Sequence, residues 1–279
     1  MSLVVVCSVS GSPGVSTTCV VLAQAWPRPA CVAELDVSGG DLQHRLRLPD
    51  GSLPPASPSL VFYQARSRAG RQDVRGFAQP TAAGVPVLFG FDSVEKAPAL
   101  REWWPRIAEG LVTSPVDVFA DLGRFLPDSP LTPVASAADV LVLVVPPSAE
   151  GLVHARHRLA ALQGEFEQRR GRPRIGVLMV TRHRDADRHV AAMRTVLASL
   201  PQVSVLGAIA TDTGSVHRMA TKAMSRNDRL TRSALPVAEA ILALLPQPAA
   251  VDVADSTMPT TAGIAPPGRG QVREHKATG

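Results

Sequence analysis

Residues 3–18 read LVVVCSVSGSPGVSTT. The first seven residues form an almost continuous apolar run, which is typical of a buried strand in a parallel sheet. Serine, glycine and proline then interrupt the run, and a helical pattern follows from about residue 18. The stretch therefore predicts a strand, a tight loop and a helix in immediate succession, which is the unit that α/β proteins repeat.

The rest of the chain repeats this alternation of short apolar runs and helical patterns. Further buried strands are predicted at 30–35, 116–122, 139–145, 174–180 and 203–209, with a short one at 85–91. Helices are predicted between them at 18–26, 58–68, 93–109, 149–169, 185–199 and 231–245. Because strands and helices alternate, we expect a three-layer α/β/α protein with a doubly wound, mostly parallel sheet.

The composition changes after Pro246. Residues 247–279 are rich in proline, alanine and threonine, lack aromatic residues and show no periodicity. Such a segment cannot bury enough apolar surface to offset the conformational entropy that it would lose on folding. We therefore predict one domain over residues 1–246 and a disordered tail over residues 247–279.

The chain is basic, with a formal net charge of +5, and it has 26 arginines but only 3 lysines. Arginines are dense in residues 151–199, which predicts weak, salt-sensitive binding to DNA, although a solvated helix face is the competing interpretation. The apolar runs are too short to span a membrane and the N-terminus lacks a secretory signal, so we expect a cytosolic protein. The three cysteines are expected to be buried free thiols.

The loop after the first strand has the length of a phosphate-binding loop. Gly11 and Thr18 match the first glycine and the last hydroxyl of the pattern G-x-x-x-x-G-K-[ST], but Ser16 and Thr17 replace its second glycine and its lysine. Backbone N–H groups at the start of the helix could still hold an anion. A tight turn capped by threonine explains the loop alone equally well. The candidate phosphate-binding residues are Gly11, Ser12, Pro13, Gly14, Val15, Ser16, Thr17 and Thr18.

Two aspartates are predicted at the carboxyl ends of parallel strands, where α/β sheets bind ligands. Asp36 follows the strand at 30–35, and Asp121 lies near the end of the strand at 116–122. Each aspartate alone could cap a helix or a turn. Together with the loop they could flank one cleft, with one carboxylate positioning an attacking water and the other holding magnesium. Asp36 and Asp121 are thus the candidate catalytic residues, and Thr18 and Asp121 are the candidate magnesium ligands.

These motifs, in this order, resemble those of the MinD/ParA family of P-loop ATPases over roughly residues 2–245. The family's first motif, G-K-G-G-V-G-K-T-T, aligns without gaps with GSPGVSTTC at 11–19. Its D-x-D motif resembles Glu34 and Asp36 with one residue between them. Further matches are Asp117 and Asp121 in the family's D-x-x-x-D strand, ADVLVLVVPPSAEGL at 138–152, and LGAIATD at 206–212.

The resemblance implies an ATPase that binds ATP and magnesium, but both family lysines are missing. The signature lysine falls on Ser12 and the phosphate-binding lysine on Thr17. The asparagine that contacts adenine in the family falls near Thr181, beside Arg182. Each missing lysine removes a charge-assisted bond to phosphate, so we expect weak binding and slow or absent hydrolysis. An arginine could replace a lysine only if it folded into the cleft, and the candidates are Arg28, Arg124, Arg182 or a residue of a second subunit.

Two functional hypotheses follow from the resemblance. In the first, the chain is a regulator with a degenerate phosphate loop, acting with a protein partner or as a homodimer in positioning, partition, or Flp/Tad pilus or secretion assembly; its loop is similar to those of actinobacterial, CpaE-like relatives. In the second, it is an active ATPase for chromosome or plasmid partition that binds DNA non-specifically. The sequence ends without a membrane-targeting amphipathic helix, so no direct membrane anchor is expected.

Overall fold

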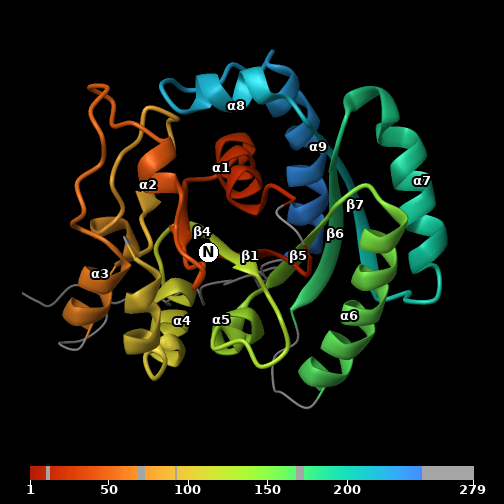
Figure 1. The fold of residues 1–279 in the computed structure, drawn as a ribbon, viewed down its shortest axis with the longest axis horizontal. Coiled ribbons are helices and arrows are strands. Elements are labelled where there is room, and N and C mark those ends of the chain that lie inside the picture. The colour runs from red at the N-terminus through yellow and green to blue at the C-terminus, as the bar shows by residue number, and fades with distance from the viewer. Residues whose placement is uncertain (11–12, 68–72, 92, 168–172, 247–279) are drawn as a thin grey trace, which may run out of the picture. The chain divides into compact units, whose positions relative to one another are not determined.

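The computed structural model describes residues 1–10, 13–67, 73–91, 93–167 and 173–246. Residues 1–246 form one compact unit, and Figure 1 shows its fold. The predicted disordered tail, residues 247–279, lies outside the described residues.

Seven described strands form one sheet, in the order β3-β2-β4-β1-β5-β6-β7, and all of these neighbours pair in parallel. The strands are β1 (Leu3–Ser8), β2 (Ala30–Glu34), β3 (Val87–Leu88), β4 (Asp117–Arg124), β5 (Val140–Val145), β6 (Arg174–Thr181) and β7 (Val203–Ala210). An isolated antiparallel bridge joins Gln79 to Val87. The prediction of a doubly wound, mostly parallel sheet is therefore confirmed.

Helices cover both faces of this sheet (Figure 1). One face carries α1 (Val15–Ala25), α2 (Leu42–Arg45), α8 (Thr213–Met219) and α9 (Arg229–Leu244). The other face carries α3 (Leu60–Ser67), α4 (Trp104–Val112), α5 (Thr132–Ala137), α6 (Ala149–Glu167) and α7 (Ala186–Leu197). Strand β1 supplies both cores, because Val4 and Val6 pack on the α1 side while Leu3 and Val5 pack on the α4 side. Both faces of the central strands are therefore buried under helices.

The helix predicted over 93–109 is wrong. The chain forms a 3-10 helix, η2 (Val94–Leu100), and then the separate helix α4. Pro98 lies inside η2, and Pro105 lies in the first turn of α4. Proline has no N–H and is tolerated mainly in the first turn of an α-helix, so the two prolines divide the segment.

Other predicted boundaries also differ from the structure. The strand predicted at 85–91 is only Val87–Leu88. Helices α2, α5 and α8 were not predicted, because they have 4, 6 and 7 residues and are too short to display a helical period. Two further short 3-10 helices are η1 (Val74–Gly76) and η3 (His183–Asp185). No described helix combines the length and apolar character needed to cross a membrane.

The strand order creates a switch point beside β1. The chain crosses from β1 to β2 on one side of the sheet centre, and from β4 it crosses past β1 to β5 on the other side. Helices α1 and α5, which follow β1 and β4, therefore leave on opposite faces. In open α/β sheets, ligands bind in the crevice outside the carboxyl ends of the strands at such a point.

Candidate functional site

A cleft of about 690 Å³ opens at this switch point, and we call it the loop cleft. Its walls come from the loop and first turn of α1, from the segment after β2, from α2, and from the segment after β4. The lining residues are Ser8, Gly14, Val15, Ser16, Asp36, Val37, Ser38, Asp41, Arg45, Gly123, Arg124, Leu126, Pro127, Asp128, Ser129 and Pro130. The structure thus brings part of the predicted phosphate loop and one predicted catalytic aspartate together.

The loop turns into α1 at Gly14, which follows Pro13. Gly14 has φ 91°, a left-handed conformation that glycine adopts without strain, and it is the N-cap of α1. Its carbonyl accepts a hydrogen bond from the Thr18 N–H at 2.8 Å. No described side chain caps this helix end, so the alternative of a threonine-capped turn is not observed. The backbone N–H groups of the first turn of α1, at Val15 and Ser16, can therefore donate hydrogen bonds to an anion in the cleft. Gly11 and Ser12 lie outside the described residues.

The two threonines of the loop have different surroundings. Thr18 is buried in the first turn of α1, with 1% of its surface exposed. The Thr17 hydroxyl accepts a hydrogen bond from Arg45 Nη2 at 2.8 Å. Arg45 belongs to α2 and lines the loop cleft. The structure thus places a guanidinium against the residue that stands where the pattern has its lysine.

Sequence reasoning missed Arg45, because 28 residues separate it from Thr17. Of the arginines proposed instead, Arg124 lines the loop cleft. Arg28 forms an ion pair with Asp117, at the other end of β4. A signal was nevertheless present, since Arg45 follows the Glu34–Asp36 motif closely and the chain after a strand must pass over the strand's carboxyl end.

Asp121 lies near the end of β4 and is fully buried. Its Oδ1 accepts a hydrogen bond from the Gly123 N–H at 2.9 Å, whereas its Oδ2 has no hydrogen-bond partner among the described residues. Burial raises the pKa of Asp121 to about 7, and the carboxylates of Glu34 and Asp36 add to the rise. The Ser16 hydroxyl and the Gly123 N–H oppose this rise. An unpaired buried carboxylate oxygen is costly, and a cation beside it would relieve that cost.

Asp36 lies at the wall of the cleft, next to the end of β4. Its Oδ1 accepts a hydrogen bond from the Ser38 N–H at 2.8 Å. Burial raises the pKa of Asp36, while the Ser38 hydrogen bonds lower it. Gly123 permits this approach, because a Cβ on Gly123 would clash with Asp36 Oδ2. Asp36 therefore reaches the cleft, and its carboxylate is near enough to Asp121 to raise the pKa of Asp121, although Asp121 itself does not line the cleft.

Glu34, at the end of β2, ties the segments around the cleft together. Its Oε1 accepts a hydrogen bond from the Leu42 N–H at 2.9 Å, and its Oε2 accepts one from the Gly90 N–H at 3.1 Å. Burial raises the pKa of Glu34, and these two N–H groups oppose the rise. Glu34 stands opposite Asp121 in the sheet register. Glu34 therefore has a positioning role, because its carboxylate holds Leu42, the first residue of α2, by a hydrogen bond.

The oxygen donors at the cleft suit a hard cation. No three His, Cys, Asp or Glu side chains in the described part of the chain are placed to hold a metal by themselves. Magnesium commonly takes one or two carboxylates and completes its shell with phosphate oxygens and water. The predicted ligands, Asp121 and Thr18, have suitable oxygens, but both are buried and neither lines the cleft as the structure has it.

The predicted adenine-side residues lie elsewhere. Thr181, at the end of β6, is 3% exposed, and its hydroxyl shares a hydrogen bond of 2.7 Å with His189 Nδ1. Arg182 lines a separate pocket of about 470 Å³. The other residues lining that pocket are His183, Arg184, Thr211 and Arg229. The structure does not bring Thr181 or Arg182 into the loop cleft.

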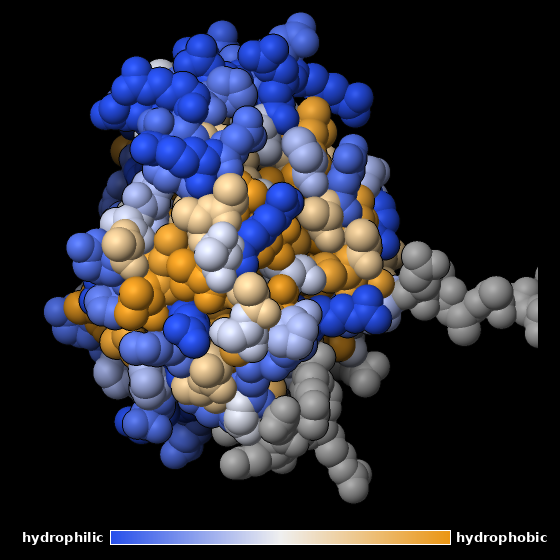
Figure 2. Space-filling view, turned by 90° about the vertical axis from the view of Figure 1, so that its right-hand side faces the viewer, coloured by the Kyte–Doolittle hydropathy of each residue, from blue (hydrophilic) through white to orange (hydrophobic). Residues whose placement is uncertain are grey.

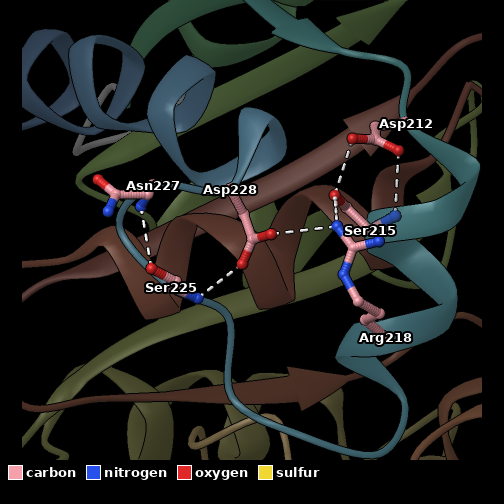
Figure 3. A network of polar contacts seen from close by, with 6 residues as sticks. All are labelled: Asp212, Ser215, Arg218, Ser225, Asn227 and Asp228. Atoms are coloured by element: carbon pink, nitrogen blue, oxygen red, sulfur yellow. Dashed lines mark hydrogen bonds and ion pairs between the residues drawn. The ribbon is translucent and has the colours of Figure 1, made fainter.

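Two other aspartates from the matched motifs have structural partners. Asp117, at the start of β4, accepts hydrogen bonds from the Ser2 N–H and from Trp26 Nε1, both at 2.7 Å. Asp212 caps α8 by accepting from the Ser215 N–H at 3.1 Å. Figure 3 shows how Asp212 and its neighbours connect α8 to the start of α9. The further contacts are Ser215 Oγ to Asp212 Oδ2 at 2.8 Å, Arg218 to Ser215 Oγ at 2.7 Å, and Arg218 to Asp228 at 3.1 Å.

The sequence matches no family model and no curated protein. The fold, in contrast, is similar to solved structures. A ParA family ATPase from Chlorobium tepidum has a TM-score of 0.66 at 17% identity, over 85% of this chain and 98% of its own. A complex of a McdA variant with ATP, from Cyanothece, has a TM-score of 0.65 at 15% identity, over 88% and 98%. MinD from Pyrococcus horikoshii, complexed with Mg-ADP, has a TM-score of 0.60 at 15% identity, over 86% and 96%. These similarities show that the chain has the α/β fold of the MinD and ParA proteins.

Proposed function

We propose that this chain, which has the fold of the MinD and ParA ATPases, binds ATP with magnesium in the loop cleft and hydrolyses it slowly or not at all. It then serves as a nucleotide-binding regulator of positioning or partition, or of Flp/Tad pilus or secretion assembly, with a protein partner or a second copy of itself. Solved proteins with this fold include complexes with ATP and with Mg-ADP, which supports the choice of ligand.

The observation that carries the proposal is the buried Asp121 carboxyl, whose Oδ2 has no hydrogen-bond partner among the described residues and whose neighbour Ser16 lies in the first turn of α1. Three acids line the loop cleft, Asp36, Asp41 and Asp128, against the two arginines Arg45 and Arg124. A bare phosphate would meet repulsion from these acids, whereas a metal-bound phosphate would supply the missing positive charge. The cleft therefore suits a polyphosphate that carries its own magnesium.

Magnesium, when bound, would neutralise phosphate charge and orient the phosphate oxygens. Asp121 and Thr18 would hold it, and Asp36 would orient a water, as proposed for the catalytic pair. The residues that favour binding are thus retained, but the loop supplies no lysine charge. Because removing one positioned donor typically costs about 10²–10³ in rate, slow turnover is expected.

The test is calorimetric titration with Mg-ATP and with ATP in excess EDTA, together with phosphate release. We expect binding that depends on magnesium, and turnover near the detection limit. Ligand at about 100 times its dissociation constant would add about 2.7 kcal/mol of stability, which a melting curve also detects. Asp121→Asn should abolish the magnesium dependence, whereas Glu109→Gln, on the exposed face of α4, should not change it.

Brisk wild-type hydrolysis that disappears with Asp121→Asn would replace the regulator by an active ATPase. The absence of any nucleotide binding would reject both hypotheses and leave a purely structural cleft.

The active partition ATPase remains the second candidate, because exposed arginines gather around α7. Arg184 and Arg188 are 75% and 74% exposed. Other arginines of the predicted basic segment have structural partners: Arg158 pairs with Glu165 at 2.6 Å, and Arg174 donates to the Leu244 carbonyl at 2.8 Å. The basic segment is therefore only partly available to phosphates.

DNA binding through α7 should be weak and should fall steeply with salt, because each neutralised phosphate releases counterions. The measurement is fluorescence anisotropy with a labelled duplex between about 50 and about 300 mM salt. The double change Arg184→Gln, Arg188→Gln should reduce the affinity and the salt slope. Arg75→Gln is the matched control, since Arg75 is also an exposed arginine paired with an aspartate. Tight binding that ignores salt would contradict a phosphate-driven contact.

A further inference from the structure

We propose that Arg45, contributed by α2, is the side chain that contacts phosphate in the loop cleft, so that the cation comes from outside the phosphate loop. This inference rests on the proposed function, because it assigns a residue to the same nucleotide. It predicts that the chain has moved its phosphate-binding charge from residue 17 to residue 45 instead of losing it.

The position of the guanidinium is the first argument. Arg45 Nη2 donates to Thr17 Oγ1 at 2.8 Å, and Arg45 also lines the cleft beside Ser16 and Gly14. Thr17 lies in the first turn of α1, whose N–H groups have no described side-chain cap. A positive charge and a helix N-terminus therefore face the same space, and both attract an anion.

The geometry of arginine is the second argument. A guanidinium has five N–H donors in a planar fork, and the bond to Thr17 uses one of them. Arg45 is half-buried, so its remaining donors lie at the boundary between protein and cleft. Arginine can bind phosphate through two parallel bonds, which lysine cannot do. The hydroxyl of Thr17 thus acts as an anchor that orients the fork, and this gives Thr17 a purpose at the position of the usual lysine.

The third argument is that α2 holds Arg45 in place before any ligand binds. Glu34 fixes the first residue of α2 through its bond to the Leu42 N–H. The Arg45 N–H donates to the Asp41 carbonyl at 3.0 Å, and Leu42 and Leu46 are buried on either side. A cation that is already positioned loses little side-chain entropy on binding. Glu34 is therefore a positioning residue for Arg45.

A second polar group, one atom of which has no partner among the described residues, lies near the first turn of α1. Asp121 Oδ2 is buried without a described partner, and Ser16, the residue before Thr17, lies beside it. Arg45 lines the loop cleft, whereas Asp121 is buried behind the first turn of α1 and is not among the residues that line the cleft. A magnesium-bound phosphate would suit both groups: Arg45 would donate to the phosphate, and Asp121 would help to hold the metal once the first turn of α1 gave it access.

The experiment is a charge transposition followed by calorimetry. The variants are Arg45→Gln, Thr17→Lys and the double variant Arg45→Gln with Thr17→Lys, and the probes are Mg-ATP and magnesium tripolyphosphate. Arg45→Gln should weaken both probes by about 10- to 100-fold, which is the range for a charged hydrogen bond. The double variant should recover most of the loss, because a lysine then stands where the arginine had reached. Thr17→Lys alone should gain little, since two cations would crowd one site.

Arg156→Gln, which removes an exposed arginine of α6, is the control and should leave both affinities unchanged. If Arg45→Gln folds poorly, Arg45→Lys and Thr17→Val replace it in the test. Arg45→Lys should retain part of the affinity for both probes. Thr17→Val should lower the affinity, because the guanidinium then loses the hydroxyl that orients it.

The outcomes separate the two proposals. A wild-type protein that binds the probes while Arg45→Gln binds them equally well overturns the role of Arg45 and leaves the proposed function standing. A wild-type protein that binds neither probe overturns the proposed function itself. Recovery in the double variant supports the transposition, because coupled residues deviate from additivity.

Discussion

Asp121 and Asp117 show how differently two aspartates of one strand can be used. Asp117 has three partners, Ser2, Trp26 and Arg28, whereas one oxygen of Asp121 has none among the described residues. Asp117 begins β4, and four residues along a strand span about 13 Å, so the two carboxylates are well separated along the strand. Asp117 stabilises the sheet at the start of β4, whereas Asp121 remains able to take a further partner.

Replacing Asp121 by asparagine should stabilise the ligand-free protein at neutral pH. The pKa of Asp121 is about 7 in the folded state against 3.8 as its ordinary value. Between about pH 4 and pH 7 the folded state therefore keeps a proton that the unfolded state releases, so stability falls as pH rises and levels off above about 7. Asp121→Asn removes this contribution, and its stability relative to wild type should grow by a few kcal/mol from about pH 4 to about pH 8.

Urea unfolding of both proteins at several pH values measures this difference. The amide oxygen of the introduced asparagine can still accept from the Gly123 N–H, so the geometry of the wall is retained. A difference that does not depend on pH would show that Asp121 is ionised in the folded protein throughout this range.

Replacing Asp117 should have the opposite effect on stability and none on the site. Asp117→Ala leaves the buried Trp26 Nε1 and the Ser2 N–H without their acceptor. A buried donor without a partner costs about 1–3 kcal/mol, and the half-exposed Arg28 adds less. We expect a loss of roughly 2–4 kcal/mol in urea unfolding with unchanged affinity for Mg-ATP at a temperature where the variant is folded. A parallel loss of affinity would mean that the two ends of β4 are coupled.

At the scale of the elements, the cleft depends on the close approach of the ends of β2 and β4. Gly123 has φ 58° and lies against the Asp36 carboxylate. A left-handed conformation costs a non-glycine residue about 1–2 kcal/mol, and the clash of a Cβ with Asp36 adds to it. Gly123 therefore allows Asp36, which follows β2, to reach the wall of the cleft.

Gly123→Ala should therefore destabilise the protein more than Gly51→Ala does. Gly51 has φ 85° but nothing within 4 Å of a built Cβ, so it carries the conformational cost without the clash. The difference between the two unfolding free energies measures the packing against Asp36. Gly123→Ala should also weaken Mg-ATP binding, whereas Gly51→Ala should not. Equal costs would show that Asp36 moves aside freely.

The whole molecule presents two kinds of surface. Figure 2 views it from the side of α7 and the edge strand β7, and shows apolar side chains across the middle of that face with hydrophilic ones above. A pocket of about 600 Å³ between α7 and α9 lies beside β7 and is lined by Val190, Ala208 and Pro236 together with Arg194 and Arg232. This mixed surface is distinct from the loop cleft, since the two share no lining residue.

Removing the C-terminal segment should leave the folded unit intact. Residues 247–279 are poor in apolar side chains that could pack, so a chain ending at Gln247 should unfold within about 0.5 kcal/mol of the full chain. Thermal unfolding of the two proteins under identical conditions is the comparison. A large drop in stability would show that the segment docks on the 1–246 unit.

The architecture could be predicted from the amino-acid sequence. Strands buried on both faces need near-continuous apolar runs, and these runs stand out at positions such as 139–145, so the parallel sheet could be predicted. The same logic predicted Asp36 and Asp121 at strand ends. The short helices could not be predicted, because a helix of four residues such as α2 is about one turn long and shows no helical spacing of apolar residues.

The groups that meet at the cleft could not be predicted, because they come together only in the folded chain. The tertiary structure paired Arg45 with Thr17, fastened α2 to Glu34, and left Asp121 Oδ2 without a partner among the described residues. It also placed Arg182 in a different pocket from the loop. The apolar pattern that identifies a strand depends only on the residues of that strand. A contact between α1 and α2 depends instead on the path of the whole segment that connects them. A missing lysine can be seen in the sequence, but the cation that stands in its place is visible only in the fold.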